Sequence, residues 1–174
     1  MSESGPRVAV LMGSDSDLEV VRPCLEILGE LGIAFEARVM SAHRTPDKVA
    51  EFSRGAAERG VRVLICAAGH AAHLAGAVAA QTILPVIGIP IASSDLHGVD
   101  ALYSTVQMPP GTPVATVALG KPGARNAGIL AAQIMALSDE ALRARLVSFK
   151  EDLGRKAAAA DETVRRQFPS GGAR

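Results

Sequence analysis

The chain has 174 residues, of which 48% are hydrophobic and 21% are charged, and its 18 basic and 18 acidic side chains give zero formal net charge. This composition excludes a disordered or fibrous protein, because enough apolar side chains are present for a sizeable core. The balanced charge gives no electrostatic basis for binding nucleic acid or a membrane surface. We therefore predict a single globular domain over residues 1–174, with flexible tails at 1–6 and 169–174.

The cysteines and the N-terminal residues bear on where the protein is located. Cys24 and Cys66 lie in apolar segments without metal-site spacing, so both are expected to be reduced core residues. Residues 1–7 lack the features of a signal peptide, and no apolar run approaches the length that spans a bilayer. These observations predict a cytoplasmic protein without a membrane segment.

The chain begins with a predicted strand, turn and helix. Residues 7–12 form a short apolar strand that ends at the turn GSDSD of residues 13–17, and an amphipathic helix over 17–31 follows. Small residues let the backbone N–H groups of this turn approach a ligand, and Ser14 and Ser16 add hydroxyls, which suits a phosphate at a helix N-terminus. Simple capping of the helix by a serine or aspartate of the turn is the alternative.

A histidine and an arginine follow the second predicted strand, which spans residues 34–40. The sequence TPD then marks the start of a helix over 45–59, which Gly60 ends. His43 and Arg44 therefore lie in a strand-to-helix turn, the position at which open α/β sheets carry their ligands. The alternative interpretation is that His43 and Arg44 are solvated loop residues without a function.

A third strand over 61–67 is nearly continuously apolar, as in a parallel sheet that is covered on both faces. Three successive strand-helix units imply a doubly wound α/β fold with right-handed crossovers. Strands at 84–89 and 114–119 complete a parallel sheet of about five strands, with a short helix near 100–106 between them. An alanine-rich helix follows the last strand.

A long C-terminal helix is predicted over 138–168, with a weak point at Gly154. Its length and its abundance of alanine and charged residues suit a helix that lies across a neighbouring subunit.

Residues 67–80 are rich in small side chains, which allow a ligand to approach the backbone. His70 and His73 lie one helical turn apart there, so a helix would place them on one face. A metal site is one interpretation, but no carboxylate or cysteine with suitable spacing accompanies the two histidines. A substrate-lining or structural role is the favoured interpretation.

Four motifs together resemble one family. They are MGSDSD at 12–17, SAHRTPD at 41–47, AGHAAHLAG at 68–76 and GVDALYSTVQMPPGTPVATVALG at 98–120. They are similar to the catalytic subunit of phosphoribosylaminoimidazole carboxylase, and more narrowly to its bacterial form, the class I PurE family of N5-carboxyaminoimidazole ribonucleotide mutases. The similarity covers nearly the whole chain in order.

The resemblance implies a flavodoxin-like three-layer sandwich and a homo-octamer with active sites between subunits. It also implies an isomerase of de novo purine (IMP) biosynthesis that moves a carboxylate from N5 to C4 of an aminoimidazole ribonucleotide. That reaction needs no metal, biotin or ATP. By motif position the proton-transferring residue is His43, and an imidazole can serve first as acid and then as base.

The resemblance also assigns the substrate contacts. Ser14, Ser16 and Arg44 would hold the 5′-phosphate, and Asp17 would accept hydrogen bonds from the ribose hydroxyls. The base and the carbon dioxide would be surrounded by Ser41, Gly69, His70 and His73. Arginine and proline in SAHRTP favour the mutase over the animal-type carboxylase, which uses CO2 directly and usually carries lysine in this motif.

One segment departs from the family's usual GAGGAAHLPG, at Ala67, His70 and Ala75. If the family glycine at position 70 has a positive φ, a histidine would intrude on the pocket or shift the loop. Two rival hypotheses follow. One is a related carboxylase, using CO2 directly or a metal on His70 and His73. The other is a nucleotide-binding flavodoxin-type module without activity, against which the intact SAHRTP motif speaks.

Overall fold

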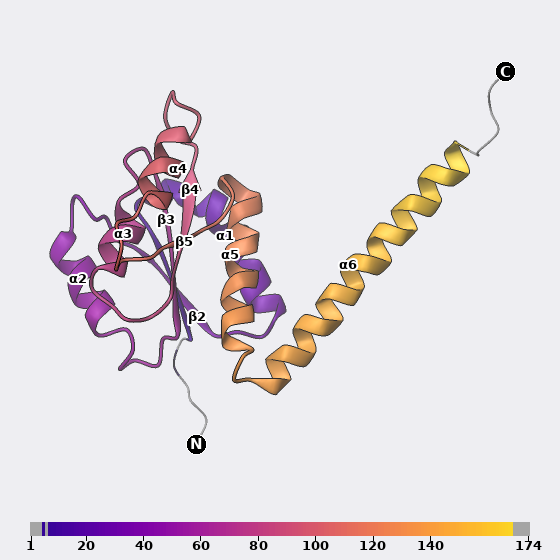
Figure 1. Cartoon of the computed structure of the whole chain (residues 1–174), viewed down its shortest axis with the longest axis horizontal. Coiled ribbons are helices and arrows are strands. Elements are labelled where there is room, and N and C mark those ends of the chain that lie inside the picture. Colours follow the sequence, from indigo (N-terminus) through magenta and orange to yellow (C-terminus); the bar gives the residue numbers. More distant parts are fainter. Residues whose placement is uncertain (1–4, 6, 169–174) are drawn as a thin grey trace.

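The computed structural model describes residue 5 and residues 7–168. It contains a five-stranded parallel sheet with the order β2-β1-β3-β4-β5. The strands are β1 (Val8–Met12), β2 (Phe35–Val39), β3 (Val63–Gly69), β4 (Val86–Ile91) and β5 (Ala115–Thr116). Helices lie on both sides of the sheet (Figure 1), which confirms the predicted three-layer α/β fold. The predicted tails at 1–6 and 169–174 lie outside the described residues, except for Gly5.

The helices alternate with the strands along the chain. They are α1 (Leu18–Glu30), α2 (Pro46–Arg54), α3 (Leu74–Ala79), α4 (Val99–Val106), α5 (Gly120–Met135) and α6 (Glu140–Gln167), with a 3-10 turn η1 (Asp15–Asp17) before α1. Successive strand residues face opposite sides, so Val10 of β1 belongs to the core with α1 and α5, whereas Leu11 belongs to the core with α2 and α3. Because both faces of the central strands are covered, their sequences are almost entirely apolar.

Small residues bring α5 close to α1. A Cβ atom added at Gly128 would lie 2.5 Å from Cγ2 of Ile27 and 3.1 Å from the carbonyl oxygen of Cys24. Ala124, Ala127 and Ala131 of α5 are fully buried on the same side. The alanine-rich sequence of this helix therefore reflects a close helix-helix contact.

Several element boundaries differ from the prediction. Helix α2 ends at Arg54 instead of residue 59, because Gly55 follows and the chain turns so that Ala56 enters the core. Strand β5 has two residues where 114–119 were expected, because this edge strand pairs only with Ile87 and Gly88 of β4. Helix α3 is the helix of the third strand-helix unit, for which no bounds were predicted, and it is only six residues long.

Helix α6 confirms the predicted long C-terminal helix and projects away from the body (Figure 1). The side chain of Asp139 accepts the N–H of Leu142 as an N-cap, and the Arg7 guanidinium donates to the same carboxylate at 2.9 Å. Leu142 is buried, but most of the helix beyond its first turns is exposed. None of the helices described is long and apolar enough to cross a membrane.

Candidate active site

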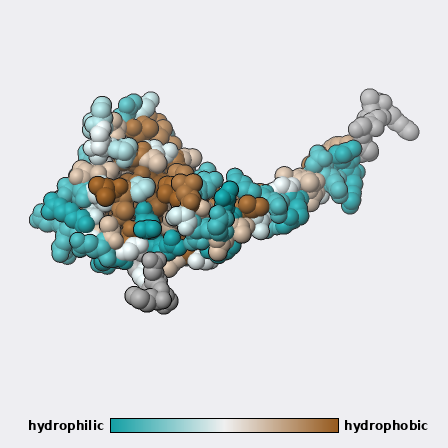
Figure 2. Space-filling view, turned by 60° about the horizontal axis from the view of Figure 1, so that its bottom comes forward, coloured by the Kyte–Doolittle hydropathy of each residue, from teal (hydrophilic) through white to brown (hydrophobic). Residues whose placement is uncertain are grey.

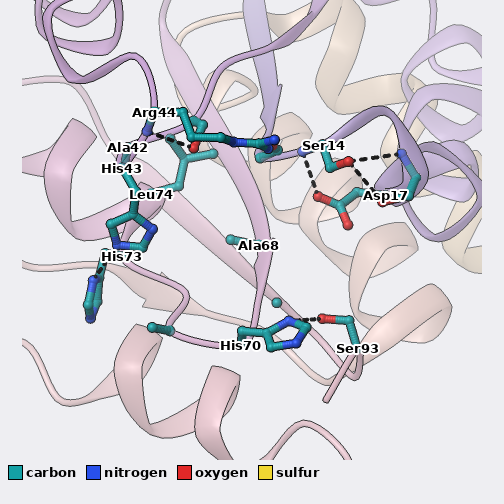
Figure 3. Close-up of a pocket in the computed structure, with 15 residues that line it drawn as sticks. Ser14, Asp17, Ala42, His43, Arg44, Ala68, His70, His73, Leu74 and Ser93 are labelled. Atoms are coloured by element: carbon teal, nitrogen blue, oxygen red, sulfur yellow. Dashed lines mark hydrogen bonds between the residues drawn. The ribbon is translucent and has the colours of Figure 1, made fainter.

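A cavity of about 420 Å³ opens at the carboxyl ends of the strands, where the loops after β1, β2, β3 and β4 meet (Figure 3). This is the edge at which parallel sheets present their ligand sites. The nine residues predicted from the sequence all line this one cavity: Ser14, Ser16, Asp17, Ser41, His43, Arg44, Gly69, His70 and His73. Motifs that lie up to 59 positions apart in the chain are thus gathered by the parallel topology.

The turn after β1 is organised as a capping box. Ser14 is the N-cap of η1, and its hydroxyl accepts the N–H of Ser16 at 3.3 Å, while Oδ2 of Asp17 accepts the N–H of Ser14 at 3.0 Å. The hydroxyl of Ser16 donates to that of Ser14 at 2.9 Å, and the Ser14 hydroxyl donates to Asp15. Ser14 therefore caps the turn, and both serines line the cavity.

Asp17 is the buried acid of the site, with 9% of its surface exposed. Burial raises the pKa of its carboxyl above the ordinary value of 3.8, and the nearby negative charge of Asp15 raises it further. The backbone N–H groups of Ser14 and Gly13 and the positive charge of Arg44 lower the same pKa without cancelling the effect of burial. Asp17 is thus a buried carboxyl at the cavity wall, and its Oδ2 already accepts the N–H of Ser14.

Arg44 joins the turn after β2 to the turn after β1. Its Nη2 donates to the carbonyl oxygen of Gly13 at 2.8 Å, and its backbone N–H donates to Oγ of Ser41 at 3.2 Å. Figure 3 shows the guanidinium extended toward Ser14. Because a guanidinium has five N–H donors in a planar fork, the group can hold an anion beside the serine hydroxyls while it keeps the contact to Gly13.

His43 and His73 contact each other directly. Nε2 of His43 lies 2.8 Å from Nδ1 of His73, and the rings meet edge to face with their centroids 5.0 Å apart. One of these nitrogens must donate and the other accept, so the two rings share one proton and their tautomers are coupled. Nδ1 of His43 and Nε2 of His73 have no hydrogen-bond partner within the described part of the chain.

Position 70 shows how the loop after β3 accommodates a histidine. His70 adopts a left-handed conformation with φ of 52°, and its Nδ1 lies 2.9 Å from Oγ of Ser93. At the preceding position, a Cβ atom on Gly69 would lie 1.8 Å from the same Oγ. Glycine at position 69 therefore lets the Ser93 hydroxyl reach the His70 ring.

The expectation that His70 and His73 would share a helical face was wrong. His70 precedes α3 and its ring contacts Ser93, whereas His73 lies at the N-cap of α3 and contacts His43 on another side of the cavity (Figure 3). In residue 5 and residues 7–168, no three His, Cys, Asp or Glu side chains gather as a possible metal site.

Ser93 lines the cavity with a polar side chain that the sequence analysis missed. It lies two residues after the end of β4, at the sheet edge where ligand-binding side chains of parallel sheets are found. The sequence signal was present in the pair of serines that follows this strand, but the expected end of β4 at residue 89 placed them farther from the sheet edge.

The cavity therefore has two chemically different regions. Hydroxyls, a carboxylate and a guanidinium face it from the turns after β1 and β2, and three imidazoles surround the remainder. Apolar side chains of Ala42, Ala68 and Leu74 lie between these polar groups (Figure 3). Such a cavity can hold a phosphorylated sugar at one end and transfer protons at the other.

Curated relatives cover most of the chain. It is 53% identical over 146 residues to the N5-carboxyaminoimidazole ribonucleotide mutase of Haemophilus influenzae, which is 84% of this chain and 89% of the relative. The protein of the same name from Thermotoga maritima is 51% identical over 151 residues, which is 87% of each chain. The protein of that name from Bacillus subtilis is 52% identical over 147 residues, 84% of this chain and 91% of the relative.

A solved structure shares the fold of this chain. The crystal structure of Treponema denticola PurE superposes with a TM-score of 0.83 at 29% sequence identity, over 92% of this chain and 99% of that one. A sequence model of one family, described as AIR carboxylase, matches residues 7–156. Since this match spans most of the chain, the chain belongs to the AIR carboxylase family.

Proposed function

We propose that the protein is an N5-carboxyaminoimidazole ribonucleotide mutase, an isomerase that moves the carboxylate from N5 to C4 of the aminoimidazole ring in purine biosynthesis. Relatives about 50% identical over most of the chain carry this name. The structural observation that carries the proposal is the contact between His43 and His73 in a cavity that also contains Ser14, Asp17 and Arg44.

His43 transfers the proton in this proposal. Loss of the N5 carboxylate as CO2 leaves an electron pair on N5, which takes a proton from the His43 imidazolium. C4 then attacks the CO2, and the resulting ring loses its C4 proton to the neutral imidazole, so no proton is consumed overall. Because Nε2 of His43 is engaged with His73, Nδ1 is the nitrogen left for the substrate, and His73 positions it.

The remaining residues hold the substrate. Ser14, Ser16 and Arg44 bind the 5′-phosphate through hydroxyls and a charge-assisted guanidinium contact. Asp17 accepts hydrogen bonds from the ribose hydroxyls, a role that suits its buried position at the cavity wall. Around the base and the CO2 lie Ser41, Gly69, His70 and His73.

We also propose that the protein is a homo-oligomer, an octamer as the family resemblance implies, and that it is cytoplasmic. His43, Arg44 and His73 are exposed in one copy, whereas CO2 must be kept from escaping into water. A neighbouring subunit would close the cavity. The free, buried thiols of Cys24 and Cys66 suit the reducing cytoplasm, and burial raises the pKa of Cys24 to about 12.

The apolar surface supports the same proposal. Apolar side chains gather on the body of the molecule, whereas the projecting helix is mostly hydrophilic (Figure 2). Along α6, apolar residues recur at spacings of three and four, and Leu146 and Phe149 pack on the body while Leu153 and Val164 are exposed. The row of apolar side chains along α6 thus extends past the part of the helix that packs on the body of the same copy. Analytical ultracentrifugation should give an octamer mass, and a monomer mass would refute this part.

Conversion of N5-carboxyaminoimidazole ribonucleotide to its C4-carboxylated isomer tests the function. Wild-type protein should catalyse it without ATP and equally fast with and without added bicarbonate. His43→Asn should lose about 10²–10⁴-fold in kcat while it still binds the ribonucleotide, because general acid-base catalysis contributes about this much. His97→Asn is the matched control, since His97 does not line the cavity.

Three results would contradict the proposal. Conversion only with bicarbonate would indicate a carboxylase that uses CO2 directly. Turnover that depends on bound metal would indicate a metal-assisted enzyme. Binding without turnover, unchanged in His43→Asn, would indicate a nucleotide-binding module without activity.

A further inference from the structure

Two non-glycine residues of the described chain have a positive φ, and both are histidines. His70 and His97 each have φ of 52°, in the left-handed region where a Cβ atom is unfavourable and glycine is not. His70 lines the active-site cavity, whereas His97 does not. The strained backbone at position 70 therefore places an imidazole where glycine would leave open space.

The ring of His70 is held by neighbouring groups. Oγ of Ser93 lies 2.9 Å from Nδ1 of His70, and this hydroxyl occupies the space that any side chain at position 69 would need. A Cβ atom on Gly69 would also lie 3.0 Å from Cβ of Ser93 and 3.1 Å from the carbonyl oxygen of Ile91. The loop after β3 and the loop after β4 are thus fitted together around the contact between Ser93 and His70.

This contact leaves one ring nitrogen for a ligand. Among the described residues, Nε2 of His70 has no hydrogen-bond partner. If the Ser93 hydroxyl donates to Nδ1, the neutral ring carries its proton on Nε2 and is a donor there. The protonated ring is a donor at the same nitrogen, so Nε2 can donate in both charge states.

The position of His70 indicates which part of the substrate it meets. Figure 3 shows His70 and Ser93 on the side of the cavity away from Ser14 and Arg44, with Ala68 between. The phosphate and ribose are assigned to the turns after β1 and β2, so the base with its carboxylate extends toward the imidazoles. A carboxylate is a strong acceptor for an imidazole N–H.

We propose that His70, oriented by Ser93, is a specificity-determining residue that donates a hydrogen bond from Nε2 to the carboxylate of the carboxylated aminoimidazole ribonucleotide. The proposal rests on the mutase function above and adds a residue that distinguishes the carboxylated ligand from the same ribonucleotide without the carboxylate. Ser93 is a positioning residue, because it acts through the ring of His70.

The test compares two ligands on His70→Gly by titration calorimetry. Glycine accepts the left-handed φ, so this variant removes the ring and leaves the loop conformation available. Affinity for the C4-carboxylated ribonucleotide should fall about tenfold, the size expected for a lost hydrogen bond to a charged group. Affinity for the uncarboxylated ribonucleotide should stay at the wild-type value. His97→Gly, with the same change at the same φ outside the cavity, should alter neither affinity.

Two results would overturn the role of His70: unchanged affinity for the carboxylated ligand, or an equal loss for both ligands. Ser93→Ala should weaken binding of the carboxylated ligand alone, by about threefold, because the ring remains but is no longer oriented. An unchanged value in that variant would overturn the role of Ser93.

These titrations need no turnover, so they separate the two proposals. Wild-type protein that binds the carboxylated ribonucleotide without isomerising it would refute the mutase function, while the comparison of the two ligands would still decide on His70. If wild-type protein binds neither ligand, both proposals fail.

Discussion

Two imidazole contacts lie in the same cavity, and they differ in what protonation does to them. In the contact between His43 and His73, two ring nitrogens face each other, so adding a proton to both rings would place two N–H groups against one another. In the contact between His70 and Ser93, the partner is a hydroxyl, which can donate or accept. The first contact is suited to moving a proton, and the second keeps a ring oriented whatever its charge.

The largest expected effect comes from treating His43 and His73 as one unit. In a double-mutant cycle, His43→Asn with His73→Asn should be about as slow as His43→Asn alone, a loss of about 10²–10⁴-fold in kcat. In contrast, the effects of His70→Gly and His43→Asn on the free energy of ligand binding should be additive in the variant that carries both. Single-turnover rates and ligand titrations measure both. A double variant much slower than His43→Asn would show that His73 does not act through His43.

Asp17→Asn tests an acceptor that belongs to neither imidazole contact. An amide can still accept the N–H of Ser14 but is a weaker acceptor for ribose hydroxyls, so we expect about tenfold weaker binding of both ribonucleotides. The ratio of the two affinities should stay constant, unlike in His70→Gly. Titration of each variant with both ligands checks this, and a changed ratio would place Asp17 near the carboxylate.

The same variant should also change the pH dependence of stability. The pKa of Asp17 is raised in the folded protein, so its stabilising contribution is present below the ordinary pKa of 3.8 and is lost as the pH rises through the raised value. Asp17→Asn should therefore gain free energy of unfolding relative to wild type as the pH rises from 3.8 to 7, which urea titrations can follow. A constant difference would contradict the raised pKa.

Gly69→Ala should break the second contact and spare the first. The added methyl would lie 1.8 Å from Oγ of Ser93, so the hydroxyl must turn away from His70. We expect about threefold to tenfold weaker binding of the carboxylated ribonucleotide, and a free energy of unfolding lower by about 1–3 kcal/mol from overpacking. Gly29→Ala is the control, since nothing lies within 4 Å of its added Cβ. If Gly69→Ala and Gly29→Ala have the same affinity and the same free energy of unfolding, the close packing of Gly69 against Ser93 is contradicted.

The smallest effect is expected far from the cavity. Asp139→Ala removes the N-cap of α6 and the ion pair with Arg7. The Tm should fall by about 2–4 °C, because loss of a cap in a protein of this size has about this consequence. Ligand affinities and kcat should stay at wild-type values. Thermal unfolding and the isomerase assay check both statements, and a changed affinity would mean that α6 communicates with the cavity.

Most of the fold followed from the sequence, because local patterns decide it. Apolar runs marked the strands, and the parallel topology followed from the alternation of strands with helices. The ends of elements were less predictable. Gly55 ends α2 because Ala56 must reach the core, and β5 is short because its partner β4 pairs with it at only two positions. Both reasons are tertiary contacts that no local pattern contains.

The site was predictable as a set of residues but not in its contacts. All nine predicted residues line one cavity, because their motifs follow the strand ends. The contacts depend on the left-handed φ of His70, because a residue with this φ cannot belong to an α-helix. His70 and His73 therefore do not share a helix. His73 contacts His43, and His70 contacts Ser93. Ser93 was missed because β4 extends two residues beyond its expected end.

The distal half of the projecting helix α6 provides a way to measure whether copies of the chain have assembled. Beyond Phe149, α6 is held mainly by its own hydrogen bonds and by exposed ion pairs such as Arg166 with Glu162, and helices of this kind open locally with little cost. Trypsin cleaves after Arg155 and Arg166 only in opened segments. If the copies assemble as proposed above, dilution that separates them should expose these bonds to trypsin, and rising concentration should protect them, while the stability of the sheet stays unchanged.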